Sequence, residues 1–74
     1  MNAQKIQELL HDQDLKSSAK VVGVHMLLHP EAQTASEIAE TVGLHRTTVG
    51  EALIRLAKDG RVSRKHHLWV GEVR

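Results

Sequence analysis

The 74-residue sequence contains no cysteine, one proline and a single aromatic side chain, Trp69. Without cysteine the chain can form neither a disulfide bond nor a thiolate metal site. No apolar run approaches the roughly 20 residues that a membrane-spanning helix needs, and the polar N-terminal stretch does not resemble a secretory signal. These absences favour a small cytoplasmic domain without a membrane partner.

The sequence also lacks the arrangements on which enzymes depend. It offers no cysteine nucleophile, no Ser-His-acid set that spacing alone would support and no glycine-rich loop for phosphates, and it is too short for a substrate cleft. Two histidine pairs, His25 with His29 and His66 with His67, have no third ligand at suitable spacing, so we expect no metal site. We therefore predict no enzyme, no cofactor and no small-molecule ligand.

What the sequence does contain is a clear helix signal in its middle. Thr34 and Glu37 have the spacing of a capping box, which predicts a helix from about Ala35. Gly43 can adopt the left-handed conformation that ends a helix. The apolar stripe of this helix is Ile38, Ala39 and Val42.

A second helix is predicted over residues 45–59, after a tight turn in which Leu44 is the expected buried plug. Asp59 and Gly60 close this helix. Its inward face carries Val49, Leu53, Leu56 and Ala57, and its outward face carries Arg46, Thr47, Gly50, Glu51, Ile54 and Arg55. A glycine in mid-helix costs about 1 kcal/mol relative to alanine, so Gly50 indicates either a close approach to a ligand or tight packing against another helix.

A basic β-hairpin is predicted over residues 61–70, with residues 65–67 at its tip. Val62, Leu68 and Val70 have strand character, and the cations along the hairpin are Arg61, Arg64 and Lys65. Trp69 is interpreted as a core residue between hairpin and helices, because no second aromatic residue exists to build a base-stacking platform.

The N-terminal third predicts two more helices. One is capped by Ser17 or Ser18 and runs to Leu28, ahead of Pro30, with Val21, Val24, Leu27 and Leu28 at core spacing. The other covers residues 3–11 within an extension over residues 1–15. Its apolar residues Ile6, Leu9 and Leu10 either pack on their own domain or form a homodimer, and we slightly favour the homodimer.

The run SEIAETVGLHRTTVGEALIRLAKDGRV resembles the winged helix-turn-helix DNA-binding domains of bacterial and archaeal regulators of the MarR and IclR types. The resemblance implies a mainly α fold with a small β-hairpin (α+β), in which residues 16–74 form a three-helix core plus a wing. It also implies that Arg46, Thr47, Thr48, Gly50 and Glu51 open a recognition helix that faces DNA. Z-form-specific winged helices also end their wing in a tryptophan. They place asparagine and tyrosine where this chain has Gly50 and Ile54, which disfavours left-handed DNA.

Charge is unevenly distributed along the chain. Residues 1–43 contain three lysines and six acidic residues, for a net charge of −3, whereas residues 44–74 contain seven cations and three acidic residues, for a net charge of +4. A basic half that contains the predicted recognition helix and wing is typical of a phosphate-binding face. His45, at the start of that helix, either donates to a phosphate or caps the helix.

We therefore predict a nucleoid-associated protein that binds duplex DNA, with helix 45–59 in the major groove and the 61–70 wing on the flanking backbone. Its expected role is transcriptional regulation. A non-specific architectural DNA binder and a winged helix used for protein contacts are the alternatives. The candidate DNA-binding residues are His45, Arg46, Thr47, Thr48, Gly50, Glu51, Arg55, Arg61, Arg64, Lys65 and His66.

Overall fold

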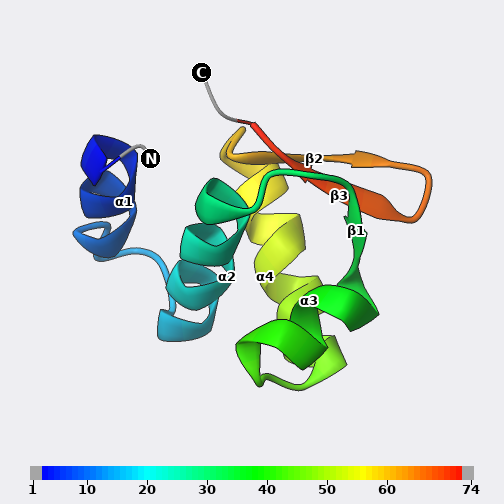
Figure 1. Ribbon diagram of the computed structural model, residues 1–74. Helices are drawn as coiled ribbons and strands as arrows, with labels where there is room; N and C mark the ends of the chain where they lie inside the picture. Colours follow the sequence, from blue (N-terminus) through cyan, green and yellow to red (C-terminus); the bar gives the residue numbers. More distant parts are fainter. Residues whose placement is uncertain (1–2, 73–74) are drawn as a thin grey trace.

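Four helices and a small antiparallel sheet make up the structure, a computed structural model that describes residues 3–72 (Figure 1). In chain order the elements are α1 (Ala3–Leu10), α2 (Ser17–Leu28), β1 (Gln33–Thr34), α3 (Ala35–Val42), α4 (Arg46–Lys58), β2 (Val62–Lys65) and β3 (Leu68–Gly71). This arrangement confirms the predicted winged-helix α+β fold. Within residues 3–72 the longest helix, α4, has 13 residues, and no helix is long and apolar enough to cross a membrane.

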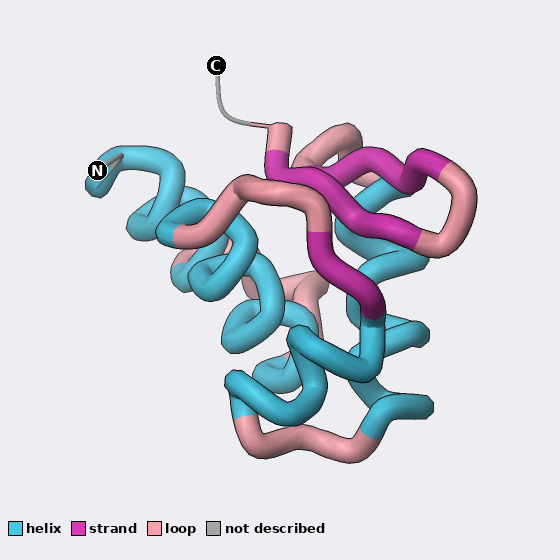
Figure 2. The backbone as a smooth tube through the Cα atoms, turned by 45° about the vertical axis from the view of Figure 1, so that its right-hand side comes forward, coloured by secondary structure: helices cyan, strands magenta, loops and turns pink. Residues whose placement is uncertain are grey.

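The sheet has the strand order β1-β3-β2, and both strand pairs are antiparallel. The hairpin of β2 and β3, the predicted wing, turns through two residues, His66 and His67, because Lys65 pairs directly with Leu68. Figure 2 shows it lying beside the short β1 strand. Strand β1 was not predicted, since two residues are too few to show the alternation that marks a strand. Gln33 of β1 pairs with Trp69 of β3, which connects the wing to the residues just before α3.

The hydrophobic core lies between α2, α3, α4 and the sheet. Its fully buried centre includes Ile38 of α3 and Val49, Leu53 and Leu56 of α4, each 0% exposed. The predicted apolar stripes of α3 and α4 therefore face inward, although Leu44, expected as a buried plug, is only partly buried. Trp69 is 8% exposed, which confirms its interpretation as a core residue.

The face of α2 that enters the core agrees only in part with the predicted one. Of the predicted residues, Val24 and Leu27 pack against the core, whereas Val21 and Leu28 are 45% and 46% exposed. The fully buried positions are instead Val22 and Met26. Apolar residues occupy almost the whole circumference of α2, so the helical period cannot choose between its faces. The cap was also wrong: the N-cap residue is Lys16, and its side chain makes no capping hydrogen bond.

Helix α1 packs back on its own domain at Leu9, which is 1% exposed. Leu9 fits over Gly23 of α2 so closely that a Cβ at Gly23 would lie 2.5 Å from Leu9 Cδ2. The predicted dimer contact at Leu9 is therefore corrected, because this side chain is already buried within one chain. Ile6 is partly buried, and Leu10 remains 46% exposed.

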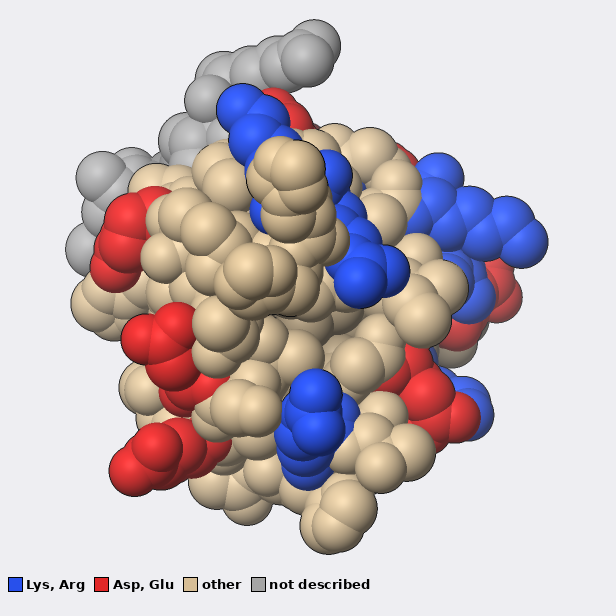
Figure 3. All heavy atoms as spheres, turned by 90° about the vertical axis from the view of Figure 1, so that its right-hand side faces the viewer, with Lys and Arg blue, Asp and Glu red and all other residues tan. Residues whose placement is uncertain are grey.

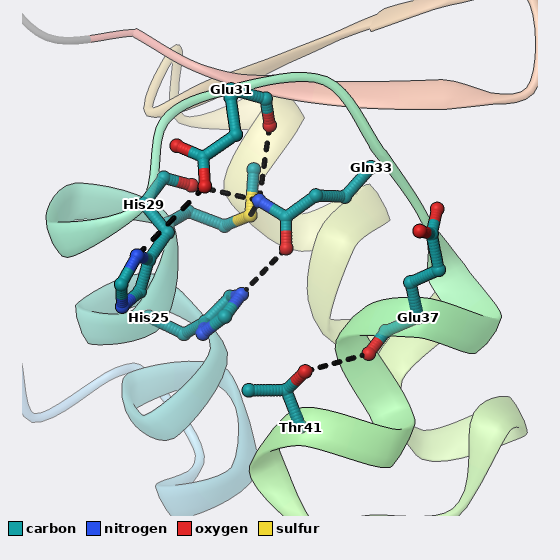
Figure 4. Close-up of polar contacts among 7 residues, drawn as sticks. His25, His29, Glu31, Gln33, Glu37 and Thr41 are labelled. Carbon is teal, nitrogen blue, oxygen red and sulfur yellow. Dashed lines mark hydrogen bonds and ion pairs between the residues drawn. The ribbon is translucent and has the colours of Figure 1, made fainter.

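A polar network holds the loop between α2 and β1 (Figure 4). His25, 9% exposed, lies 2.8 Å through Nε2 from Oε1 of Gln33. The Gln33 amide nitrogen donates to the carbonyl oxygens of His29 (2.8 Å) and Glu31 (3.0 Å). Since the amide must donate to these carbonyls, its oxygen accepts from His25. Across residues 3–72 no group of three or more potential metal ligands comes together.

Candidate functional site

The start of α4 is fixed by the turn that precedes it. Gly43 ends α3 in the left-handed conformation, with φ of 73°. His45 is the N-cap of α4, and its Nδ1 accepts a hydrogen bond of 3.2 Å from the backbone N–H of Thr47. Of the two roles considered for His45, capping is therefore visible in the structure. With the apolar face of α4 buried in the core, its polar face is left toward solvent.

An open groove of about 510 Å³ runs between α4, the start of α3 and the wing. We call it the α4–wing groove. It is lined by Thr34, Ala35, Ser36, Arg46, Thr47, Gly50, Ile54, Arg64, His67 and Trp69. None of these residues is acidic. Figure 3 looks onto this side of the molecule, where Lys and Arg side chains lie above and below a tan central area and acidic side chains lie toward its margins.

The middle of the groove is apolar and accessible to solvent. Ile54 is 63% exposed, so it is not buried under the wing. A Cβ built at Gly50 would meet no atom within 4 Å. Tight packing against a neighbouring helix is therefore excluded as the reason for this glycine.

Arg64 of the wing is held at two points. Its Nε donates to the backbone carbonyl of His66 at 2.7 Å, and its guanidinium carbon lies 5.5 Å from the centre of the Trp69 ring. His66 adopts a φ of 60°, which a non-glycine residue rarely does, so the Arg64 hydrogen bond helps to hold this tight turn. With Nε engaged, the two terminal nitrogens of Arg64 are the donors that an acceptor in the groove can reach.

Three of the predicted site residues face a different hollow. Thr48, Glu51 and Arg55 line a concavity of about 350 Å³ on the opposite flank of α4, together with Asp14, Lys16, Ser18, Ala19 and Ala52. Its two acidic and two basic side chains balance each other. Arg55 is also paired with Asp59 at 3.3 Å. This flank has no excess positive charge with which to attract phosphates.

Arg61 lies apart from both hollows of α4. Its guanidinium is 3.5 Å from the carboxylate of Asp12, in the loop that follows α1. Lys65 and His66 are exposed at the tip of the wing and do not line the α4–wing groove. Of the predicted site residues, the groove therefore brings together Arg46, Thr47, Gly50 and Arg64.

The sequence-based candidates omitted the edge that α3 contributes. Thr34 and Ser36 line the groove because α3 begins there, and the capping box of Thr34 and Glu37 was the signal that marked this start. The Glu37 carboxylate accepts from the Thr34 backbone N–H at 2.9 Å, and the Thr34 hydroxyl accepts from Glu37 N–H at 3.1 Å. Hydrogen bonds from the Thr34 backbone and side chain hold the pKa of Glu37 below its ordinary value of 4.5. His67 was also omitted, because the turn had no fixed register in the sequence.

Comparison with known proteins identifies solved structures that have a similar fold. No protein-family model and no curated protein matches the chain. Among solved structures, a Zalpha domain of Cyprinid herpesvirus 3, whose binding mode to Z-DNA has been determined, superposes with a TM-score of 0.64 and 25% identity. The match covers 78% of this chain and 98% of that domain.

A MarR family protein from Bacillus stearothermophilus superposes with a TM-score of 0.61 and 20% identity. That match covers 97% of this chain and 53% of the MarR family protein, so this chain spans about half of its length. The chain therefore has the winged-helix fold.

Proposed function

We propose that this protein binds duplex DNA through the α4–wing groove, with α4 directed into the major groove and the wing against the flanking backbone. The observation that carries the proposal is the groove itself. It is open, contains Arg46 and Arg64, and has no acidic residue in its lining. A phosphate backbone requires such a surface, since one carboxylate in it would oppose binding.

The shape of α4 supports the same function. Thr47 and Gly50 are small residues on the groove side of the helix, and nothing fills the space above Gly50. The α4 backbone can therefore approach a nucleic acid closely. Arg46 stands at the N-terminal end of α4, where the helix dipole also favours an anion. The winged-helix Zalpha domain that binds Z-DNA shows that a fold of this kind serves nucleic-acid recognition in at least one similar protein.

Transcriptional regulation is the finer form of the proposal, and it requires preference for one duplex sequence. In the groove, the side chains of α4 and the wing that can hydrogen-bond base edges or phosphates include Arg46, Thr47, Arg64 and His67. Selection of bound duplexes from a random pool tests this step. A reproducible enriched sequence supports a regulator, whereas a pool without enrichment supports an architectural DNA-binding protein.

Binding of left-handed duplex DNA is the second candidate function. It is favoured by the likeness to the Zalpha domain, which this chain covers almost completely, and by the position of Trp69 in the groove wall. The small Gly50 and aliphatic Ile54 argue against it. Circular dichroism of an alternating dG-dC duplex separates the two candidates, because conversion to the left-handed form inverts the spectrum. An unchanged spectrum with measurable binding supports ordinary duplex recognition.

The primary experiment is fluorescence anisotropy of a labelled duplex across a salt series. If Arg46 and Arg64 each neutralise one phosphate, the logarithm of the binding constant should fall with the logarithm of salt concentration at a slope of about −2. Replacing either residue, Arg46→Ala or Arg64→Ala, should reduce the steepness of that slope by about 1. Lys20→Ala is the matched control, since Lys20 lies on α2 outside the groove lining.

Two results would contradict this proposal. Equal losses of affinity in Lys20→Ala and Arg64→Ala would show that overall charge, not the groove, governs binding. Absence of binding at low salt would exclude generic duplex recognition and would favour a winged helix that contacts proteins.

A further inference from the structure

A third hollow, separate from the two that flank α4, lies between α1, α2 and the base of the wing. Its volume is about 220 Å³. The inner wall is formed by Leu9 and Val62, which are 1% and 3% exposed, with the half-buried Leu27 and with Gly23. We call this cavity the α1 pocket. Pockets for drug-sized ligands are about 300–1,000 Å³, so the α1 pocket suits only a small molecule.

The rim of the α1 pocket carries charges of both signs. Lys5 and Glu8 reach it from α1, Arg61 from the residue before β2, and Glu72 from the residue after β3. Arg61 is only partly exposed, and its ion pair with Asp12 is a single long contact of 3.5 Å. A carboxylate in the pocket can therefore pair with Arg61 at closer range than Asp12 does.

We propose that the α1 pocket binds a small aliphatic zwitterion, the chemical class of a free α-amino acid with a branched aliphatic side chain. The side chain of the ligand contacts Leu9, Leu27 and Val62, where burial of methyl groups supplies most of the affinity. Its carboxylate pairs with Arg61, and its ammonium pairs with Glu72. A ligand with one charge only would make one of these two ion pairs, so it should bind less tightly than the zwitterion.

The pocket is connected to both ends of the wing. The backbone N–H of Arg61 donates to the carbonyl of Leu56 at 2.9 Å, and the Glu72 N–H donates to the carbonyl of Arg61 at 3.1 Å. A ligand that contacts Leu9 of α1 and is held between Arg61 and Glu72 therefore links α1 to the residues at the two ends of the hairpin. Any effect of this ligand on duplex binding rests on the proposed function, whereas binding of the ligand in the α1 pocket is independent of it.

The test is thermal unfolding of the full chain with added L-leucine, followed by circular dichroism. At a leucine concentration ten times its Kd, the folding equilibrium constant should rise about elevenfold, which raises the Tm by several degrees. Three matched compounds each lack one feature: 4-methylpentanoate lacks the ammonium, 3-methylbutylamine lacks the carboxylate, and glycine lacks the aliphatic chain. Each should raise the Tm less than leucine does. No stabilisation by leucine, or equal stabilisation by glycine, would overturn the proposal.

Substitutions then locate the effect. Arg61→Gln and Glu72→Gln should each abolish most of the leucine-dependent rise in Tm, whereas the exposed controls Lys58→Gln and Glu40→Gln should retain it. If Arg61→Gln does not fold, Leu27→Phe serves in its place, because the larger ring fills the pocket and should remove the leucine effect. A leucine effect that survives both Leu27→Phe and Glu72→Gln would overturn the assignment. Duplex binding by anisotropy is measured separately, so failure here leaves the proposed function intact.

Discussion

Substitution of Gly50 should change the stability of the fold and the affinity for duplex DNA in opposite directions. Gly50 lies inside α4, and a Cβ there would have no neighbour within 4 Å. Because glycine in a helix interior is about 1 kcal/mol less favourable than alanine, Gly50→Ala should raise the free energy of unfolding by about 1 kcal/mol. In a domain of this size that gain corresponds to a Tm increase of about 4–8 °C.

The same position should respond in the opposite direction in a binding assay. Gly50 lines the α4–wing groove, and a side chain there projects into the space that the nucleic acid is proposed to occupy. Gly50→Ala adds one methyl group and should weaken duplex binding slightly. Gly50→Leu fills much more of the groove and should weaken it by tenfold or more, or about 1.4 kcal/mol.

Thermal denaturation and fluorescence anisotropy on the same preparations test both halves of this expectation. Lys58→Ala, at the exposed C-terminal end of α4, is the control for a substitution in the same helix outside the groove. If Gly50→Leu binds duplex DNA as tightly as the parent chain, the groove is not the binding surface. If Gly50→Ala lowers the Tm, the space above Gly50 is not open and the structural reasoning fails.

Three further substitutions test the fold that supports the groove. In Gly71→Ala the new Cβ would lie 2.4 Å from the carbonyl oxygen of Met26 and 3.0 Å from Pro30 Cα, so β3 must move away from the backbone of these residues. Urea denaturation should show a loss of about 1–3 kcal/mol in the free energy of unfolding, and an unchanged midpoint would contradict the predicted clash. Gln33→Leu removes the partner of His25 and should cost about 1–3 kcal/mol of unfolding free energy in the same assay, whereas a neutral result would show that water replaces the amide. The pKa of Glu37 is lowered on folding, so its contribution is present above the ordinary pKa of 4.5 and is lost as pH falls through the lowered value; Tm should fall less on acidification in Glu37→Gln than in the parent chain, and parallel pH profiles would refute this.

The parts of the fold that were predictable from sequence are those fixed by local chemistry. The capping box of Thr34 and Glu37 sets the start of α3, and both of its hydrogen bonds are present. Gly43 ends that helix with positive φ, and Gly60 follows α4 with a φ of 76°. Each of these features involves residues close together in the chain, so a short window of sequence contains all the information needed.

Features that depend on distant partners were not predictable in the same way. The core-facing side of α2 is chosen by Leu9, which occupies the surface around Gly23, and by α4 on the adjacent face. Strand β1 exists because Gln33 pairs with Trp69, 36 positions along the chain. The local sequence of α2 is apolar on nearly all sides, so it carries no information about which neighbour covers which side.

The candidate site illustrates the same limit at the level of side chains. Helical spacing correctly placed Arg46, Gly50 and Arg55 outside the core, but it could not show that the wing covers one flank of α4 only. Arg46 and Gly50 consequently line the α4–wing groove, whereas Arg55 lines the opposite hollow. Arg61, assigned to the wing because it precedes β2, is directed toward Asp12 by a contact that spans most of the chain.

The salt dependence of binding can distinguish the cations that line the α4–wing groove from those that lie outside it. Residues 44–72 contain six Lys and Arg residues, but the α4–wing groove is lined by two of them, Arg46 and Arg64. If the whole basic half bound phosphates, the salt slope would be about −5, whereas the two groove arginines give about −2. A steep slope would mean that the chain binds as a diffuse positive surface, without a defined register on the duplex. A shallow slope that disappears on replacement of both arginines would mean that the wing and α4 hold the backbone at fixed points, which is the condition for any discrimination between duplexes by shape or sequence.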